Sequence, residues 1–354
     1  TGLMAGLSTA SKYNGIVFIV VPIIVAMLTK NKHIWVFLLA SLMGFVMGCP
    51  YSIIRFNTFW AYFSGITNAA MEITPLWNLD YYQGIGGYFR YYLSYALGWP
   101  LLTLSIIGMI LLIINTILKI KSREFDWYLK TNLVLLIPIF IIYIIFSNAK
   151  RQVIMYGLPL YPFLLLLSSK TIIDLYLKIK HRIFFQFIFF TIAVFISGYT
   201  LVYSLSYTNL FVTQNVREDA SGWIEKNIPK TAAIGLTKRY FWTPPVLRQY
   251  HPPYKVVSYR DDHFSLIEGI QSLKQTAKQV DYLVLSDFEY RDILRLSKKF
   301  PEEVRILKEI MHRKFHLIAK FEKSPSFLGI SFNKKWPPWD WMYPNPTIIV
   351  LKKD

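Results

Sequence analysis

The sequence predicts a polytopic α-helical membrane domain of about six spans plus a partial one, followed by a small extracytoplasmic α/β domain. Three observations predict this class. Of the 354 residues, 54% are hydrophobic and only 17% are charged, which is too apolar and too poor in charge for an ordinary soluble domain. The charge is sparse in the first part of the chain and dense in the second. Long charge-free stretches occur only in the first part.

The charge distribution separates a membrane domain, residues 1–207, from a soluble domain, residues 208–354. The first contains 15 Lys and Arg against 5 Asp and Glu, and the second contains 24 against 16. In the second domain the cations are dispersed among acidic residues, which argues against a nucleic-acid surface. We therefore expect an integral, multi-pass protein of the cell membrane whose partner is the lipid bilayer.

Six apolar stretches are predicted to cross the bilayer. A helix needs roughly 20 apolar residues to cross a hydrocarbon core of about 30 Å. The predicted spans, of which the first two are short, are Ile16–Leu28, Ile34–Cys49, Leu101–Leu118, Thr131–Asn148, Val153–Ser169 and Ile183–Tyr207. The residues before Lys12 resemble the end of a further helix. The chain starts inside this pattern and shows no signal peptide, so we expect additional sequence upstream.

The loop charges predict the orientation. Cytoplasmic loops are rich in Lys and Arg. Three short loops, Lys30–His33, Lys119–Lys130 and Lys170–Arg182, together hold about ten such residues in about 29 positions. The alternate loops, residues 10–15, 50–98 and 148–152, hold five in about 60. Strict alternation of spans then places the soluble domain outside the cytoplasm.

The soluble domain alternates helical patterns with short apolar strands, which is typical of a small α/β sheet domain. Helices are expected over Val216–Asn227, Leu266–Lys278 and Arg291–Met311, the last with a possible interruption at Pro301. Strands are expected over Ala232–Leu236, Lys255–Tyr259, Tyr282–Ser286, His316–Phe321 and Thr347–Leu351.

The first candidate site is the sequence Lys12-Tyr13-Asn14, which falls between two short apolar segments on the predicted extracytoplasmic side. The backbone between two such segments is non-helical. At membrane depth, non-helical backbone is tolerated only where it is buried in protein or lines a water-filled cavity. Lys12 is then a candidate contact for an anion such as a phosphate. The commoner reading is a lysine that snorkels from a helix end.

The second candidate site is Lys150-Arg151-Gln152, followed by Tyr156. Lys150 and Arg151 are adjacent cations on the predicted extracytoplasmic side, where basic loops are disfavoured, so a specific role is expected for them. A guanidinium matches phosphate oxygens with two parallel hydrogen bonds. A basic hairpin at the lipid headgroups, with tyrosines as an interfacial belt, explains the same residues equally well.

The third candidate is the aromatic-rich extracytoplasmic loop, residues 50–98, which suits interfacial helices or a lid over a sugar or lipid. Its carboxylates Glu72 and Asp80 are candidate general bases toward a hydroxyl. Isolated loop carboxylates are more often solvated or paired with nearby arginines, here Arg55 or Arg90.

Other patterns argue against a cofactor. The single cysteine, Cys49, excludes an intramolecular disulfide framework and a cysteine-based zinc site. His312 and His316 have helical spacing but lack the Glu and third ligand of a zinc protease. We expect no cofactor, although the residues leave a divalent metal open. The aromatic and proline-rich stretch Trp336–Pro344 favours a packed loop over a glycan-contact surface.

Three motifs resemble the C-terminal portion of lipid-carrier-dependent glycosyltransferases of the GT-C type, the dolichyl-phosphate-mannose protein mannosyltransferase and aminoarabinose transferase group. They are the segments 6–14 (GLSTASKYN), 150–162 (KRQ leading into YGLPLYP) and 220–229 (ASGWIEKNIP). The resemblance implies a polyprenyl- or dolichyl-phosphate-linked sugar as donor and a hydroxyl acceptor on a protein, lipid or glycan. It also implies a catalytic carboxylate in an earlier extracytoplasmic loop, upstream of Thr1.

The resemblance and the residues predict one mechanism. Negative charge grows on the lipid phosphate as the sugar departs, and fixed cations stabilise this charge more than the ground state. We expect Lys12 and Arg151 to supply those cations, with Lys150 second and hydrogen bonds from Tyr13, Asn14 and Tyr156. The alternatives are a lipid or glycan flippase and a non-enzymatic scaffold that presents the soluble domain.

Overall fold

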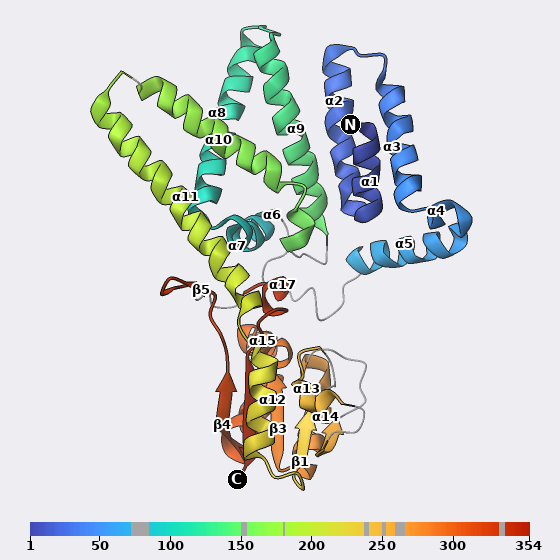
Figure 1. Cartoon of the computed structure of the whole chain (residues 1–354), viewed down its shortest axis with the longest axis vertical. Coiled ribbons are helices and arrows are strands. Elements are labelled where there is room, and N and C mark those ends of the chain that lie inside the picture. Colours follow the sequence, from blue (N-terminus) through green and yellow to red (C-terminus); the bar gives the residue numbers. More distant parts are fainter. Residues whose placement is uncertain are drawn as a thin grey trace. The chain divides into compact units, whose positions relative to one another are not determined.

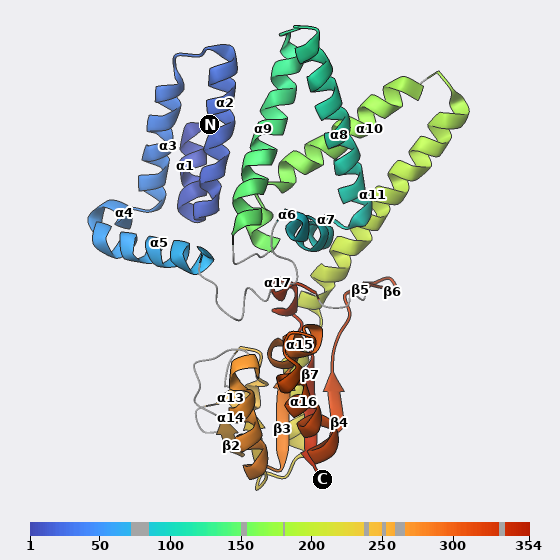
Figure 2. The ribbon, with the colours of Figure 1, turned by 180° about the vertical axis from the view of Figure 1, so that it is seen from behind.

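The computed structural model describes residues 1–71, 85–149, 154–179, 181–236, 241–249, 253–258, 266–332 and 337–354. The chain divides into two compact units, Thr1–Thr200 and Leu201–Asp354, which we call the helical unit and the sheet unit. Their boundary lies inside α11 (Ile183–Val212), so this helix contributes to both units. Figures 1 and 2 show the ribbon from two sides.

The helical unit consists of apolar helices joined by short connections. In chain order its elements are α1 (Gly2–Ser11), η1 (Tyr13–Ile19), α2 (Val20–Thr29), α3 (Ile34–Gly48), α4 (Tyr51–Ile54), α5 (Phe56–Met71), α6 (Ile85–Gly87), η2 (Tyr88–Leu93), α7 (Ser94–Leu97), α8 (Trp99–Lys121), α9 (Trp127–Asn148), η3 (Ile154–Gly157), α10 (Tyr161–Ile179) and the first part of α11.

Within the described residues, three helices are long and apolar enough to cross a membrane, where the sequence predicted six. They are α8, α9 and the helix that begins with α11. The helices Tyr13–Thr29 and Ile34–Gly48 are apolar but shorter. At about 1.5 Å per residue, the 15 residues of α3 reach about 22 Å, short of a hydrocarbon core of about 30 Å. The outline of apolar helices followed by a small sheet domain is confirmed.

The predicted span Val153–Ser169 has different bounds. The helix there, α10, begins at Tyr161 and runs to Ile179. Pro162 fits the first helical turn, where a missing N–H costs nothing. The helix then continues through residues that the charge pattern assigned to a loop, because Lys170 and Asp174 pair at 2.6 Å one turn apart. These charges shorten its apolar stretch.

Close backbone contact joins α1 to α3. Gly2 and Gly6 on α1, and Gly44 and Gly48 on α3, lie in this contact at a spacing of four residues. A Cβ atom on Gly6 would lie 1.9 Å from the Ser41 carbonyl oxygen. Small residues at this spacing let helices in a bilayer approach closely, where no hydrophobic effect drives them together. The glycines therefore account for the close packing of α1 against α3.

A polar contact joins α8 to α10. The Ser105 hydroxyl bonds the Ser168 hydroxyl at 2.7 Å and donates to the Leu164 carbonyl oxygen at 3.1 Å. Gly108 lies against Thr171 one turn further along. Interhelical hydroxyl bonds of this kind are common between helices in membranes.

The outward surface of α11 is apolar. Phe184, Phe187 and Phe190 are each exposed by 67% or more. A helix with this surface needs an apolar solvent, since contiguous exposed apolar patches are rare on soluble monomers. The exposed apolar surface of α11 is thus compatible with a position in a membrane.

The sheet unit carries a five-stranded mixed sheet in the order β2-β1-β3-β7-β4, in which β7 runs antiparallel to both neighbours. Its elements are α12 (Val216–Asn227), β1 (Ala233–Leu236), α13 (Pro245–Arg248), β2 (Lys255–Ser258), α14 (Leu266–Gln279), β3 (Tyr282–Ser286), α15 (Asp287–Arg295), α16 (Pro301–Glu309), η4 (Ile310–Lys314), β4 (Phe315–Phe321), the hairpin β5 (Ser326–Phe327) and β6 (Ile330–Ser331), α17 (Trp339–Met342) and β7 (Ile348–Lys353).

Two cores cover the two faces of this sheet. Val284 of β3 packs with Ala220 and Ile224 of α12, whereas Leu283 and Leu285 pack with α14, α15 and α16. This alternation follows from the two-residue period of a strand. The central strand β3 is buried along its whole length.

Candidate functional site

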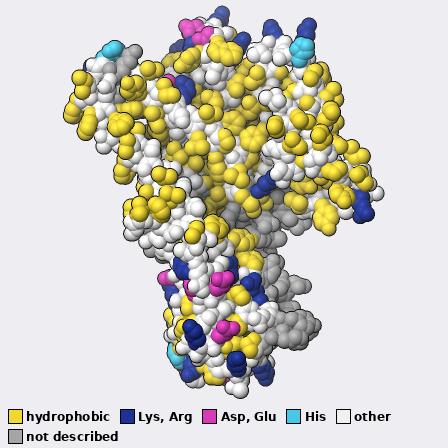
Figure 3. All heavy atoms as spheres, in the orientation of Figure 1, with side chains coloured by type: hydrophobic (Ala, Val, Ile, Leu, Met, Phe, Trp, Pro, Cys, Tyr) yellow, Lys and Arg dark blue, Asp and Glu magenta, His cyan; other side chains and the backbone are white. Residues whose placement is uncertain are grey.

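The two ends of the helical unit differ in charge. The connections α2–α3, α8–α9 and α10–α11 lie at one end, the upper end in Figures 1 and 2. They contain Lys30, Lys32 and His33, then Arg123, then Arg182. Figure 3 shows the Lys, Arg and His side chains gathered there above a mostly hydrophobic surface. The turn between α1 and η1 lies at the opposite end of the unit.

The described carboxylates of the helical unit all belong to the basic end. Lys119 contacts Glu124 at 3.2 Å and Asp126 at 2.6 Å, and Lys170 contacts Asp174. Lys12, at the other end, is exposed and forms no ion pair within the described part of the chain. Its charge is therefore available to an external anion.

The backbone around Lys12 explains why the helix stops there. Lys12 is extended, with φ −153° and ψ 125°. Its N–H donates to the Ser8 carbonyl oxygen at 3.0 Å, and its own carbonyl accepts from Gly15 at 2.8 Å. The chain then folds back so tightly that a Cβ on Gly15 would lie 2.6 Å from the Ser8 carbonyl. The sequence predicted this break correctly.

Tyr13 and Asn14 occupy the first turn of η1. The Tyr13 ring meets the rings of Phe59 and Phe63 edge-on, with centroids 6.1 and 5.2 Å away, so α5 covers this turn. The Asn14 side-chain nitrogen is buried and has no hydrogen-bond partner among the described residues. A buried donor without a partner costs about 1–3 kcal/mol. Asn14 therefore has a donor to offer to a ligand.

Tyr156 lies in η3 and packs against the apolar core of the helical unit. Its ring stacks on Phe146 at 6.4 Å. The neighbouring Tyr161 hydroxyl donates to the Ile154 carbonyl oxygen at 2.7 Å and so ties η3 to the start of α10. Val17 of η1 belongs to this same core, although it is far from Tyr156 in the sequence.

A cavity of about 300 Å³ adjoins that core, at the lower end of the usual range for ligand pockets. It lies among α6, η2, α8, α9 and α10 and carries no charged side chain. Its lining residues are Gly86, Phe89, Leu93, Leu102, Ser105, Ile106, Met109, Ile139, Phe140, Tyr143, Leu160 and Leu164. Such a lining suits a hydrocarbon chain. This cavity is not visible in the sequence, because its walls come from distant segments whose apolar residues are indistinguishable from those of a core.

The remaining candidate residues lie outside the described residues. These are the cations Lys150 and Arg151 and the carboxylates Glu72 and Asp80. Within the described residues, no three His, Cys, Asp or Glu side chains gather into a metal-binding group.

The sheet unit has one position at which its topology favours a second site. In open α/β sheets, ligands bind beyond the carboxyl ends of strands where the strand order reverses, here between β1 and β3. Trp242 and Phe288 fill this position, stacked at 5.3 Å and almost fully buried. The space left among the lining residues is about 10 Å³, room for one water molecule.

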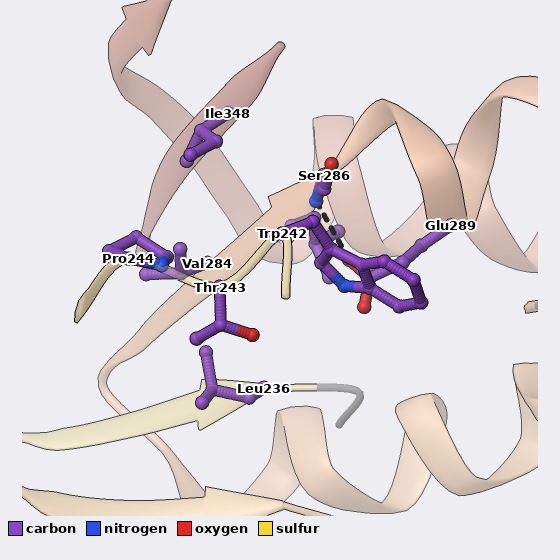
Figure 4. Close-up of a pocket in the computed structure, with 9 residues that line it drawn as sticks. Leu236, Trp242, Thr243, Pro244, Val284, Ser286, Glu289 and Ile348 are labelled. Atoms are coloured by element: carbon purple, nitrogen blue, oxygen red, sulfur yellow. Dashed lines mark hydrogen bonds between the residues drawn. The ribbon is translucent and has the colours of Figure 1, made fainter. Parts of the chain in front are cut away.

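Two buried carboxyls flank this stack. Figure 4 shows the Glu289 carboxylate accepting the Ser286 N–H bond, beside the Trp242 indole. Burial raises the pKa of Glu289 to about 8, although the Ser286 and Trp242 bonds act against the shift. Burial also raises the pKa of Asp287 to about 6, against its bonds to Thr347 and Ser286. The capping-box pattern Ser286-x-x-Glu289 was a sequence signal for this arrangement.

A cavity of about 160 Å³ adjoins Asp287. Its polar groups bond one another: the Asn345 amide donates to the Lys323 carbonyl, and the Lys323 ammonium pairs with Asp219 at 2.8 Å. Buried arginines hold the neighbouring proline-rich stretch, since Arg217 donates to the Tyr343 carbonyl and Arg291 to the Pro337 carbonyl. These bonds indicate packing, as the sequence favoured for this stretch.

Comparison with protein-family models, with curated proteins and with solved structures finds no match to this chain.

Proposed function

We propose that this chain is a multi-pass membrane glycosyltransferase that moves a sugar from a polyprenyl- or dolichyl-phosphate carrier to an acceptor hydroxyl on the extracytoplasmic side. The observation that carries the proposal is the exposed Lys12, followed by the buried Asn14 donor, both without a partner among the described residues, in a unit whose core borders an apolar cavity. A cation and an amide donor suit a phosphate. The cavity suits the isoprenoid chain attached to it.

The membrane topology belongs to the same proposal. We infer six crossings, with α2, α3 and α10 joining the three membrane-length helices through local thinning of the bilayer. The end of the helical unit that carries the basic connections then faces the cytoplasm. Lys12 and the C-terminal part of the chain face the other side.

The proposed reaction balances as a displacement. The acceptor oxygen attacks the anomeric carbon, the bond from that carbon to the phosphate oxygen breaks, and the acceptor proton passes to a carboxylate. Lys12 and Asn14 stabilise the phosphate as it gains charge, which favours the transition state over the ground state. Arg151, Lys150 and Tyr156 are proposed to assist. Glu72 and Asp80 are the proposed candidates for this base.

The test is sugar transfer by the purified protein in proteoliposomes, with a radiolabelled polyprenyl-phosphate sugar and release of polyprenyl phosphate as the readout. Lys12→Ala should lower turnover roughly 100-fold, if it removes about 3 kcal/mol of transition-state stabilisation. Lys32→Ala is the matched control, because Lys32 is an exposed lysine at the basic end of the same unit, and it should leave turnover unchanged. Equal turnover in Lys12→Ala and wild type would remove the assignment.

One observation favours the flippase alternative. Asn132, inside α9, is 1% exposed, and neither polar atom of its side chain has a hydrogen-bond partner among the described residues. Polar groups inside membrane helices commonly mark transport pathways. Bilayer crossing of the lipid without release of polyprenyl phosphate, abolished by Asn132→Leu, would support this alternative.

A further inference from the structure

The hairpin of β5 and β6 presents apolar side chains to its surroundings. Its two strands pair Ser326 with Ser331 and Phe327 with Ile330. The two turn residues, Leu328 and Gly329, both have positive φ, 49° and 78°, as the tight two-residue hairpin turn requires. Leu328 is 81% exposed and Ile330 is 51% exposed. An isolated two-stranded hairpin is only marginally stable in water, so an apolar one needs a partner surface.

The root of this hairpin is fixed to the last part of α11. The Phe332 N–H donates to the Pro325 carbonyl oxygen at 2.8 Å and closes the hairpin. The Asn209 side-chain amide donates to the Ser326 carbonyl oxygen at 3.0 Å. The Phe332 ring meets the Tyr203 ring edge-on at 5.1 Å. The hairpin therefore has a defined height along α11.

That height matches a bilayer surface. A span of roughly 20 residues that begins at Ile183 ends near residue 202. Tyr203 and Tyr207 follow at once and pack on Phe332 and Trp341, so the sheet unit begins where such a span ends. In Figures 1 and 2 the hairpin projects from the end of the sheet unit at which α11 enters. The hairpin root is thus level with the headgroups of the leaflet that α11 leaves.

We propose that the β5–β6 hairpin is a membrane-inserting finger whose tip, Phe327–Ile330, penetrates the leaflet beside α11. The insertion is shallow, because the outer backbone groups of a two-stranded ribbon need water or headgroups as hydrogen-bond partners. The apolar tip lies at the boundary between headgroups and acyl chains, about 5–10 Å deep, as amphipathic interfacial segments do.

This finger gives the sheet unit a second attachment to the bilayer besides α11. One helix allows rotation about its own axis, whereas a helix and an inserted hairpin together fix the rotation of the domain over the membrane. The inference requires that α11 spans the bilayer and does not depend on the proposed sugar transfer.

The test measures the depth of the hairpin tip in proteoliposomes made from phosphatidylethanolamine and phosphatidylglycerol. Cys49→Ser removes the single native thiol, and Leu328→Cys then accepts an environment-sensitive fluorophore. The matched control carries Lys308→Cys, an exposed position on α16 of the same unit. Spin-labelled lipids quench fluorophores inside the bilayer, and iodide quenches those in water.

We expect the fluorophore at position 328 to be quenched by spin-labelled lipid at least threefold more than at position 308, with the opposite order for iodide. Equal lipid quenching at the two positions would overturn the proposal. Protection from iodide without lipid quenching would overturn it too and would assign the tip to a protein surface. Ile330→Cys repeats the measurement one residue past the turn, so that a local disturbance at Leu328 cannot decide the result.

Discussion

At the scale of single residues, the distribution of paired and unpaired polar groups distinguishes the two ends of the helical unit. Lys119 and Lys170 each have a carboxylate at 2.6 Å, and the aromatic ring of Tyr128 lies within 5.8 Å of both ammonium groups. Lys12 has no such carboxylate within the described residues, and the Asn14 donor beside it is unsatisfied. Unsatisfied groups that persist in a fold point to a ligand more directly than a charge count does.

Asn14 should contribute to phosphate binding through its amide N–H. Asn14→Asp keeps the size of the side chain but replaces the donor with an acceptor that repels phosphate. We expect it to weaken polyprenyl-phosphate binding by more than tenfold in a filter-binding assay. Asn31→Asp at the basic end is the control and should leave binding unchanged. If Asn14→Asp binds as well as wild type, the buried amide is only a structural feature.

Glu289 should make the sheet unit less stable as the pH rises. Its pKa is about 8 in the folded protein and near 4.5 when exposed, so the folded state binds more protons between these values. Stability therefore falls as pH rises from about 5 to 8, by up to roughly 1.4 kcal/mol per unit of pH. Glu289→Gln should remove this dependence, since an amide can accept the same Ser286 bond without a charge.

The measurement for Glu289 is the apparent Tm of the detergent-solubilised protein at pH 5 and pH 8. We expect the Tm of Glu289→Gln to exceed that of wild type at pH 8 by more than at pH 5. Glu225→Gln, which changes an exposed carboxyl, should show no such difference. A Tm difference that is the same at both pH values would contradict the burial argument.

At the scale of elements, the spacing of glycines explains how α1 packs against α3, which hydropathy alone does not predict. Apolar stretches located α8, α9 and α11 well, because each runs long without a charge. The same measure predicted α2 and α3 as spans, although their helices are short, and it placed the start of α10 eight residues early. The packing of α3 depends on its contact with α1, in which Gly6 lies against Ser41. Hydropathy does not measure such a contact.

Gly6→Val should separate α1 from α3. A side chain at Gly6 collides with the Ser41 backbone, which cannot move without displacing α3. We expect a fall of several degrees in the apparent Tm of the detergent-solubilised protein. The matched control is Gly65→Val on α5, where a Cβ meets nothing within 4 Å. Equal effects of the two substitutions would show that the contact is not tight.

The candidate site was only partly predictable at this scale. The break at Lys12 follows from a lysine between two apolar segments. The apolar cavity and the hairpin finger were not visible in the sequence, because the cavity forms from distant helices and the strands of the hairpin are only two residues long. The buried carboxyl of Glu289 was missed as well, because the capping-box pattern Ser286-x-x-Glu289 marks a helix start but does not show that the carboxyl is buried.

At the scale of the whole molecule, the account requires opposite sides of the membrane for the basic connections and the sheet unit. In the Cys49→Ser background, Lys308→Cys should react with a membrane-impermeant maleimide in intact cells. Lys32→Cys should react only after permeabilisation, because the positive-inside rule places it in the cytoplasm. Reaction of both positions in intact cells would contradict the topology.

The central claim is that Lys12 recognises the phosphate of a lipid carrier, and the most direct test compares two ligands that differ only in this group. The affinities of polyprenyl phosphate and the matching polyprenol are measured on the wild-type protein, on Lys12→Ala and on Lys32→Ala in nanodiscs. The account predicts that wild type and Lys32→Ala prefer the phosphate at least tenfold, whereas Lys12→Ala binds the two lipids equally. A phosphate preference that survives in Lys12→Ala would contradict it.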